Sequence, residues 1–307
     1  MYDTAQKFYR ELDRCYAEGG IAKAEEFLLA CKNAPEDDRT CIAACNELGS
    51  LYRGTSRFPQ SLAAFAQARD LAARVYGAHT SQYATVLCNM AGTCRLAEDF
   101  EQAVALFRRA IAIYAEAGES DGYLYANVWN NLSLAYRDMN RLEDAIRCVE
   151  QALTVLETLP QYRQELAISL NNLAVLHHAA GDNTRAAACM SRSMEAFDSC
   201  AEEENVHYAA GLNSLASFLY STGEYEQALT AFQKSAQYTL HFFGENLEYA
   251  ITWQNMSRVY EVMGRKKDAI DALCKVKSLY NSLLGPDHPR TAAAAEEIAR
   301  LEEECPL

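Results

Sequence analysis

Large apolar residues and small residues recur along most of the chain with a period of 41 or 42 residues. Spacings of three and four residues inside each period predict amphipathic helices. The first helix of each period, helix A, carries a large residue at Leu48, Met90, Leu132, Leu173, Leu215 and Met256. The second, helix B, carries a small residue at Ser61, Ala103, Ala145, Ala186, Ala228 and Ala269. We expect these small residues where two helices approach closely.

Turn signals such as residues 181–183 (Gly-Asp-Asn) separate helix A from helix B. Each period therefore predicts a helical hairpin that buries its apolar face only by stacking on its neighbours. The expected repeats are residues 39–79, 80–121, 122–162, 163–204, 205–246 and 247–288. Residues 2–38 are expected to form a degenerate hairpin, with Ala24 and Leu28 on the helix B pattern, and residues 289–304 a capping helix. Together they predict one repeat domain over residues 1–307.

The columns of residues resemble the tetratricopeptide repeat, whose order of large, Leu, small, aromatic, Ala, aromatic and Ala they follow. Its first large position matches Cys45, Leu87, Trp129, Leu170, Leu212 and Trp253. The long period and the segment LLGPDHPRTA (283–292) are similar to the kinesin-light-chain-type branch. Over about residues 40–290, the resemblance implies an all-α fold. That fold is a right-handed superhelical α-solenoid of about seven antiparallel helical hairpins plus a C-terminal capping helix.

Asparagines recur at the same period inside helix A, as in VWNNLSLAY (128–136), although asparagine is a poor helix former. The first column holds Asn46, Cys88, Asn130, Asn171, Asn213 and Gln254. The second holds Glu47, Asn89, Asn131, Asn172, Ser214 and Asn255. Side-chain amides both donate and accept, so a ladder of them facing the concave side suits the backbone of an extended peptide. The resemblance implies this use for the asparagines of the second column. In an alternative role, which is compatible with peptide binding, these amides join neighbouring A helices.

A further row on helix A consists of Arg53, Arg95, Arg137, His178, Tyr220 and Glu261. If the row faces inward, the N-terminal half of the groove is basic. One hypothesis is that these arginines hold an acidic partner segment through charge-assisted hydrogen bonds. The other is that they pair with nearby acids of the chain, such as Asp138 or Glu98. The sequence leaves both open.

Charge and cysteine usage narrow the classes of partner and compartment. The chain has 307 residues and a formal net charge of −14, which argues against binding nucleic acid or an anionic membrane. Its 11 cysteines include no CxxC pair. Cys41 and Cys45 are one helical turn apart, without a second pair to complete a metal site. With no leader-like N-terminus and no apolar run of about 20 residues, we expect a cytoplasmic protein with reduced thiols.

No phosphate-binding, zinc-protease or nucleophile-elbow motif is present, and His177 stands in a core column. We therefore expect a non-enzymatic protein without cofactor or metal, whose concave groove binds a protein or peptide segment. One alternative is a scaffold that assembles through its ends or convex face, including as a homo-oligomer. Another is the sensor part of a bacterial peptide-responsive regulator.

Overall fold

The computed structural model of the chain describes residues 3–33, 37–198 and 206–303. Within these ranges every long element is an α-helix, and a short 3-10 turn, η1, spans Pro160–Tyr162. The expected boundaries at residues 2, 204, 205 and 304 lie outside the described residues. In chain order the helices are α1 (Asp3–Asn33), α2 (Asp38–Gly54), α3 (Phe58–Val75), α4 (Ser81–Leu96), α5 (Phe100–Glu116), α6 (Tyr123–Asp138), α7 (Leu142–Leu156), α8 (Arg163–Ala179), α9 (Asn183–Asp198), α10 (Val206–Ser221), α11 (Tyr225–Phe243), α12 (Leu247–Val262), α13 (Lys266–Leu284) and α14 (Pro289–Glu303).

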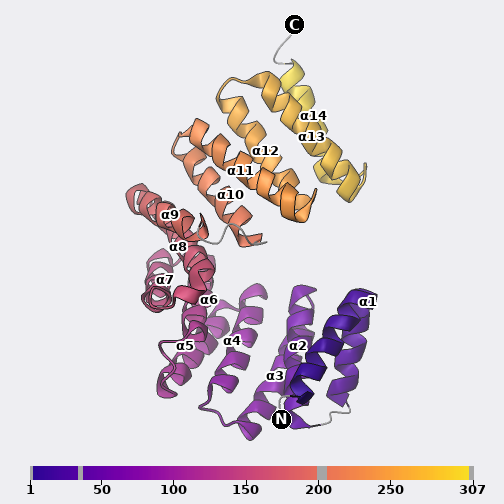
Figure 1. The fold of residues 1–307 in the computed structure, drawn as a ribbon, viewed down its shortest axis with the longest axis vertical. Helices are drawn as coiled ribbons and strands as arrows, with labels where there is room; N and C mark the ends of the chain where they lie inside the picture. Colours follow the sequence, from indigo (N-terminus) through magenta and orange to yellow (C-terminus); the bar gives the residue numbers. More distant parts are fainter. Residues whose placement is uncertain (1–2, 34–36, 199–205, 304–307) are drawn as a thin grey trace. The chain divides into compact units, whose positions relative to one another are not determined.

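The chain divides into two compact units, Met1–Pro160 and Gln161–Leu307. In each unit consecutive helices pack against one another, as Figure 1 shows for the pairs α2–α3, α4–α5, α10–α11 and α12–α13. The A helices also contact the A helix of the next repeat: α2 touches α4, α4 touches α6, α8 touches α10 and α10 touches α12. This arrangement of stacked hairpins confirms the predicted all-α solenoid fold.

The helix α1 is two helical stretches joined at Gly20. Its φ of 61° and ψ of −150° lie in a region that essentially only glycine adopts. The turn folds the first stretch back on the second, so Phe8 packs near Phe27 with ring centroids 5.6 Å apart. Ala24 and Leu28 are fully buried in the same cluster. Residues 3–33 therefore form a hairpin that covers one side of α2.

The small column of helix B is fully buried in all six repeats, from Ser61 to Ala269. Serine is accepted there because its hydroxyl finds a backbone acceptor on helix A. The Oγ atom of Ser61 donates to the carbonyl of Gly49 at 2.7 Å. Buried polar groups are tolerated when they are hydrogen-bonded in this way. The column therefore marks a close contact between the helices of each hairpin.

The six turns between helix A and helix B share one backbone conformation. Each contains one residue with φ between 58° and 86°, at Ser56, Glu98, Asn140, Gly181, Gly223 and Gly264. In the first turn, the N–H of Arg57 donates to the carbonyl of Tyr52 at 2.8 Å and that of Ser56 to the carbonyl of Arg53 at 3.1 Å. This pair of bonds is the Schellman motif, which satisfies carbonyls at a helix C-terminus. The motif therefore fixes the direction in which the chain leaves helix A and enters helix B.

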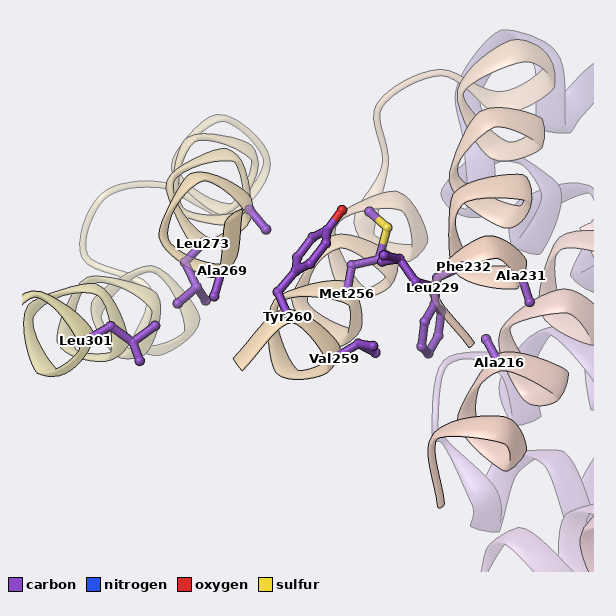
Figure 2. Packing of buried hydrophobic residues seen from close by; sticks show 11 residues of the cluster. Ala216, Leu229, Ala231, Phe232, Met256, Val259, Tyr260, Ala269, Leu273 and Leu301 are labelled. Carbon is purple, nitrogen blue, oxygen red and sulfur yellow. The ribbon is translucent and has the colours of Figure 1, made fainter. Parts of the chain in front are cut away.

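The C-terminal helix α14 covers the last hairpin. Its Leu301 is fully buried and belongs to the cluster that contains Met256 of α12 and Leu273 of α13. Figure 2 shows Leu301 on the α14 side of this cluster, with Phe232 of α11 at the opposite side. The predicted capping helix therefore completes the apolar core of the second unit.

Candidate peptide-binding surface

The predicted site residues lie on the A helices, α2, α4 and α6 in the first unit and α8, α10 and α12 in the second. The surface that they form in each unit is called the A-helix face below. All of the predicted asparagines are partly buried, because the apolar columns beside them pack inside the hairpins. They therefore lie where one A helix meets the next.

In the first unit, side chains of the first column reach the second column of the next repeat. The Nδ2 atom of Asn89 donates to Oδ1 of Asn46 at 2.9 Å, across 43 residues. The thiol of Cys88, in the first column, likewise shares a hydrogen bond with Asn131, in the second column of the next repeat. Burial raises the pKa of the Cys88 thiol to about 12, so it stays neutral. Asn131 also donates to Asn127, one turn earlier in α6.

In the second unit, α8 and α10 are joined by a hydrogen bond between the same two columns, whereas α10 and α12 are joined through a different residue. The Nδ2 atom of Asn171 donates to Oγ of Ser214 at 3.4 Å, again across 43 residues. Asn213 instead exchanges hydrogen bonds with the hydroxyl of Thr252, at 3.0 and 3.1 Å. The Oδ1 atom of Asn171 is buried without a hydrogen-bond partner in the described part of the chain. The alternative in which amides join neighbouring A helices thus describes Asn46, Asn89, Asn171 and Asn213.

Two predicted residues differ from these. The side chains of Asn172 and Asn255 are partly buried and make no hydrogen bond with any residue that the structure describes. Asn130 is likewise partly buried, and its backbone carbonyl accepts from the hydroxyl of Ser133 at 2.6 Å. Within the described part of the chain, the donors and acceptors of the Asn172 and Asn255 amides are therefore unused.

Two of the three arginines pair with one carboxylate. Nη1 of Arg95 lies 2.6 Å from Oδ2 of Asp138, and Nη2 of Arg137 lies 3.1 Å from Oδ1 of the same residue. This is the second of the two hypotheses for the arginine row. The ion pair between Arg95 and Asp138 links α4 to the end of α6.

Arg53 has a different environment. It is partly buried, its Nη1 atom donates to the backbone carbonyl of Asn89 at 3.3 Å, and no carboxylate of a described residue lies within ion-pair distance. Burial lowers the pKa of Arg53, and the positive charge of Arg95 lowers it further, whereas Glu47 raises it. The guanidinium keeps its charge at neutral pH, with most of its N–H donors unused.

Glycine at position 92 leaves room for this guanidinium, a feature that the sequence patterns did not single out. A Cβ atom on Gly92 would lie 3.0 Å from Nη1 of Arg53. Leu134 and Val175 occupy the equivalent position of the next two repeats. The signal in the sequence was the missing side chain at a position where the next two repeats carry large apolar residues.

Glu47, which replaces asparagine in the second column, is also partly buried beside Arg53. Burial raises the pKa of its carboxyl group, while a hydrogen bond with Asn46 and the charge of Arg53 lower it. Tyr9 and Tyr16 of α1 lie close enough for the Glu47 charge to raise their pKa values, although burial contributes more. The first unit thus carries a cluster of titratable groups on its A-helix face.

The remainder of the row is not basic. His178 uses both ring nitrogens, with Nδ1 2.8 Å from Oδ1 of Asn183 and Nε2 3.1 Å from Oγ of Ser221. The ring of Tyr220 packs against that of Tyr225, with centroids 5.8 Å apart. Glu261 accepts from Arg300 of α14 at 2.9 Å. In the second unit, the side chains of the arginine row therefore mainly bond to or pack against other residues of the chain.

A cavity of about 370 Å³ lies between α8 and α10 on the A-helix face of the second unit. Its walls include His178 and Asn213, which the sequence singled out, and Val175, Ser217 and Phe218, which it did not. A larger cavity of about 490 Å³ lies between α5, α6 and α7, on the opposite side of helix A, with Trp129 and Tyr136 in its wall. The A-helix face of the first unit therefore carries charged groups, and that of the second unit has a neutral hollow.

In the described residues, no three His, Cys, Asp or Glu side chains are placed to hold a metal ion. The nine cysteines in the same ranges are free thiols, and Cys200 and Cys305 lie outside them. His177 is 4% exposed in the hairpin core.

None of the described helices combines the length and the apolar character needed to cross a membrane.

Comparison with known proteins identifies the repeat. The family model described as tetratricopeptide repeat matches residues 39–116, 84–158, 124–199 and 207–282. Protein KINESIN LIGHT CHAIN-RELATED 2 of Arabidopsis thaliana is 20% identical over 292 residues, which cover 94% of this chain and 44% of that protein. The chain thus spans less than half the length of this relative. The similarity confirms the kinesin-light-chain-like repeat type that the sequence resembles.

Solved structures show the same fold. A signal-transduction ATPase with a tetratricopeptide repeat sensor from Pyrococcus horikoshii superposes with a TM-score of 0.71 at 12% identity, covering 99% of this chain and 47% of that one. The apo form of the quorum sensor NprR from B. thuringiensis superposes with a TM-score of 0.54 at 15% identity, covering 96% and 87%. With the match over most of its length and the stacked hairpins, the chain belongs to the tetratricopeptide repeat family.

Proposed function

We propose that this chain is a non-enzymatic binding module whose A-helix face holds a partner peptide or protein segment, with Arg53 selecting acidic side chains. Stacked-hairpin repeats typically bind partners along an extended surface of this kind. The observation that carries the proposal is the environment of Arg53. It is a partly buried cation without a carboxylate partner among the described residues, whereas Arg95 and Arg137 already share Asp138.

The physical reason is the cost of removing a charge from water. A partly buried guanidinium has lost part of its hydration, and an incoming carboxylate restores favourable interactions through charge-assisted hydrogen bonds. Gly92 keeps the space beside Nη1 open. Glu47 opposes this effect because it is a nearby negative charge, but its own pKa is raised by burial. Arg53 is therefore the arginine of the row best suited to bind an acid.

In the second unit, backbone contacts with a bound segment are assigned to the uncommitted amides. Asn172 and Asn255 have free donors and acceptors, which pair with the N–H and C=O groups of an extended chain whatever its sequence. The amides of Asn46, Asn89, Asn171 and Asn213 act mainly as links between A helices. This assignment divides the predicted ladder into residues that hold the protein together and residues that contact the ligand.

A random-peptide display library tests the proposal. The wild-type protein is expected to enrich peptides with Asp or Glu, and Arg53→Ala is expected to lose that preference. The matched control is Arg69→Ala in helix B of the same repeat, whose arginine pairs with its exposed neighbour Asp70. It should enrich the same peptides as the wild type. Retained acidic enrichment in Arg53→Ala would assign the selectivity to other residues.

The absence of any enriched peptide would favour the scaffold alternative. The cavity between α5, α6 and α7 is then the first surface to test for a partner.

Sensor repeats of larger regulators form a second candidate class. The fold likeness to the Pyrococcus horikoshii ATPase, which has a tetratricopeptide repeat sensor, covers 99% of this chain, and a quorum sensor shares the fold. A cytoplasmic location is consistent with the free thiols, since a reducing compartment keeps them unpaired. Purifying the protein from its native cells together with the proteins bound to it would identify the output of such a sensor.

A further inference from the structure

The cavity of about 490 Å³ between α5, α6 and α7 belongs to the first unit, and its lining includes none of the predicted peptide-binding residues. Small-molecule sites typically have volumes of about 300–1,000 Å³. Ile111 of α5 and Leu132 of α6 form apolar walls and are buried. The indole ring of Trp129 is only partly buried, so it remains available to stack against a planar group. The walls therefore favour a ligand with an aromatic ring.

Arg108 of α5 brings an uncompensated positive charge to the same cavity. Its side chain is exposed, and its Nη2 atom donates to the hydroxyl of Tyr136 at 2.7 Å. No carboxylate of a described residue lies within ion-pair distance of this guanidinium. Most of its N–H donors are therefore available to an anion beside the aromatic wall.

The other charged groups at the cavity add to this effect. Arg147 of the lining and Arg141 beside it share the carboxylate of Asp144. Arg141 also covers the ring of Tyr136, with Cζ 4.6 Å from the ring centroid, so that ring is already used by a cation. Glu150 of the lining is the opposing charge. Three guanidiniums and two carboxylates thus leave a local positive excess, although the whole chain carries a net charge of −14.

We propose that the cavity between α5, α6 and α7 is a second binding site, which takes a small aromatic acid. The ring of the ligand lies against Trp129 and Ile111, and its carboxylate accepts hydrogen bonds from Arg108. A carboxylate matches the planar guanidinium, which can donate two parallel hydrogen bonds to it. The site is separate from the A-helix face and does not depend on the proposed function.

Nuclear magnetic resonance of the full chain tests the proposal, with naphthalene-2-carboxylate as the probe. The chain has two tryptophans, Trp129 at this cavity and Trp253 in α12, so two indole N–H signals are expected, which Trp253→Phe assigns. The probe should shift the Trp129 signal until it saturates. Naphthalen-2-ylmethylammonium, with the same ring and the opposite charge, should bind at least about tenfold more weakly.

Arg108→Gln should weaken binding of the carboxylate probe by about tenfold. The matched control is Arg109→Gln, because Arg109 is also exposed and its Nη1 atom lies 3.8 Å from Oε1 of Glu116, outside the cavity lining. That variant should bind the probe as the wild type does. If Arg108→Gln fails to fold, Arg147→Gln removes the other guanidinium of the lining and should likewise weaken binding.

Three results would each overturn this proposal: no shift of the Trp129 signal, equal affinity for the two probes, or unchanged affinity in both Arg108→Gln and Arg147→Gln. Arg53→Ala should bind the naphthalene probe as the wild type does, because Arg53 lies outside this cavity. The peptide selectivity of the A-helix face and the binding of aromatic acids can therefore fail independently.

Discussion

At the scale of single residues, the same residue type has different contacts in successive repeats. Arg95 and Arg137 share Asp138, but Arg53 contacts a backbone carbonyl. Asn46 and Asn89 bond to each other, whereas Asn172 makes no side-chain hydrogen bond with a described residue. A periodic column therefore predicts where a side chain lies, and its neighbours decide what it does.

The hydrogen bond between Asn46 and Asn89 predicts energetic coupling. Asn46→Ala and Asn89→Ala should each destabilise the protein, and the double variant should lose less than the sum. The expected coupling is about 0.5–1.5 kcal/mol, the net contribution of a typical protein hydrogen bond. Urea unfolding of the four proteins measures it. Asn172→Ala and Asn255→Ala provide the comparison, and each should change stability by no more than about 0.5 kcal/mol. Strict additivity at Asn46 and Asn89 would contradict the link.

Glu47 predicts a pH dependence of stability. Burial raises its pKa in the folded chain above the ordinary value of 4.5, so the folded state holds the proton more tightly than the unfolded state. The contribution of this group is present at low pH and is lost as pH rises from about 4.5 through the raised pKa. Glu47→Gln avoids this loss and should gain stability relative to the wild type over that window.

Urea unfolding midpoints between about pH 4 and pH 8 measure this difference. The control is Glu150→Gln, because Glu150 is exposed on α7 and its replacement should leave the pH profile unchanged. If the difference in unfolding midpoint between Glu47→Gln and the wild type narrowed with rising pH, its sign would be opposite to that expected for a buried carboxyl group.

At the scale of elements, hairpin geometry depends on the close contact between helix A and helix B. Gly49 of α2 packs against Phe65 of α3, and a Cβ atom on Gly49 would lie 2.7 Å from the phenyl ring. Phe65 is fully buried and cannot move away freely. The absence of a side chain at Gly49 is therefore a packing requirement of the hairpin.

Gly49→Ala should therefore destabilise the protein by about 1–3 kcal/mol through overpacking. Gly54→Ala, at the end of the same helix, has no atom within 4 Å of the added Cβ. It should be neutral, or stabilising by up to about 1 kcal/mol, because alanine restricts the unfolded chain. Chemical denaturation of both variants separates the two causes. Equal effects would mean that backbone propensity, not the contact with Phe65, governs this helix.

At the scale of the whole molecule, the chain is a series of neighbouring contacts grouped into two compact units. In such repeat arrays, stability is approximately a sum of repeat and nearest-neighbour contributions. A local defect should therefore weaken its own surroundings more than distant repeats. The second unit offers a matching site, because a Cβ atom on Gly211 would lie 2.5 Å from the ring of Phe197.

Hydrogen exchange of the full chain tests whether each substitution mainly weakens its own unit. Gly49→Ala should speed amide exchange mainly in α2 to α5, and Gly211→Ala mainly in α8 to α11. Mass spectrometry of proteolytic fragments resolves the two patterns. An equal increase along the whole chain in both variants would indicate that the two units open as one cooperative body.

Most of the fold could be predicted from the sequence. The period of 41 or 42 residues repeats local patterns, and a helix is a local structure whose buried stripe follows from 3.6 residues per turn. Small residues such as Ala103 and Ala145 also indicated where helices meet, and both are fully buried. The predicted hairpins, the absence of strands in the described ranges and the repeat family all followed from these local regularities.

The chemistry of the A-helix face was only partly predictable. The polar rows were placed correctly on the A helices, but which amide reaches which neighbour depends on the axial shift between successive A helices. A single column cannot encode that shift. Nothing in the row of arginines distinguished Arg53 from Arg95 before Asp138 was located beside one of them. The cavity at Val175 and Phe218 likewise arises from two helices and the space between them.

The sequence by itself determined the repeat, the helix pairs and the residues that fill the hairpin cores, because these depend on contacts that recur at fixed spacing. Only the tertiary structure decided which charges are paired, which amides remain free and where the A-helix face is hollow. These features depend on side chains from different repeats meeting in space. In the pairs Asn46–Asn89 and Arg95–Asp138, for example, the two residues are 43 positions apart in the chain.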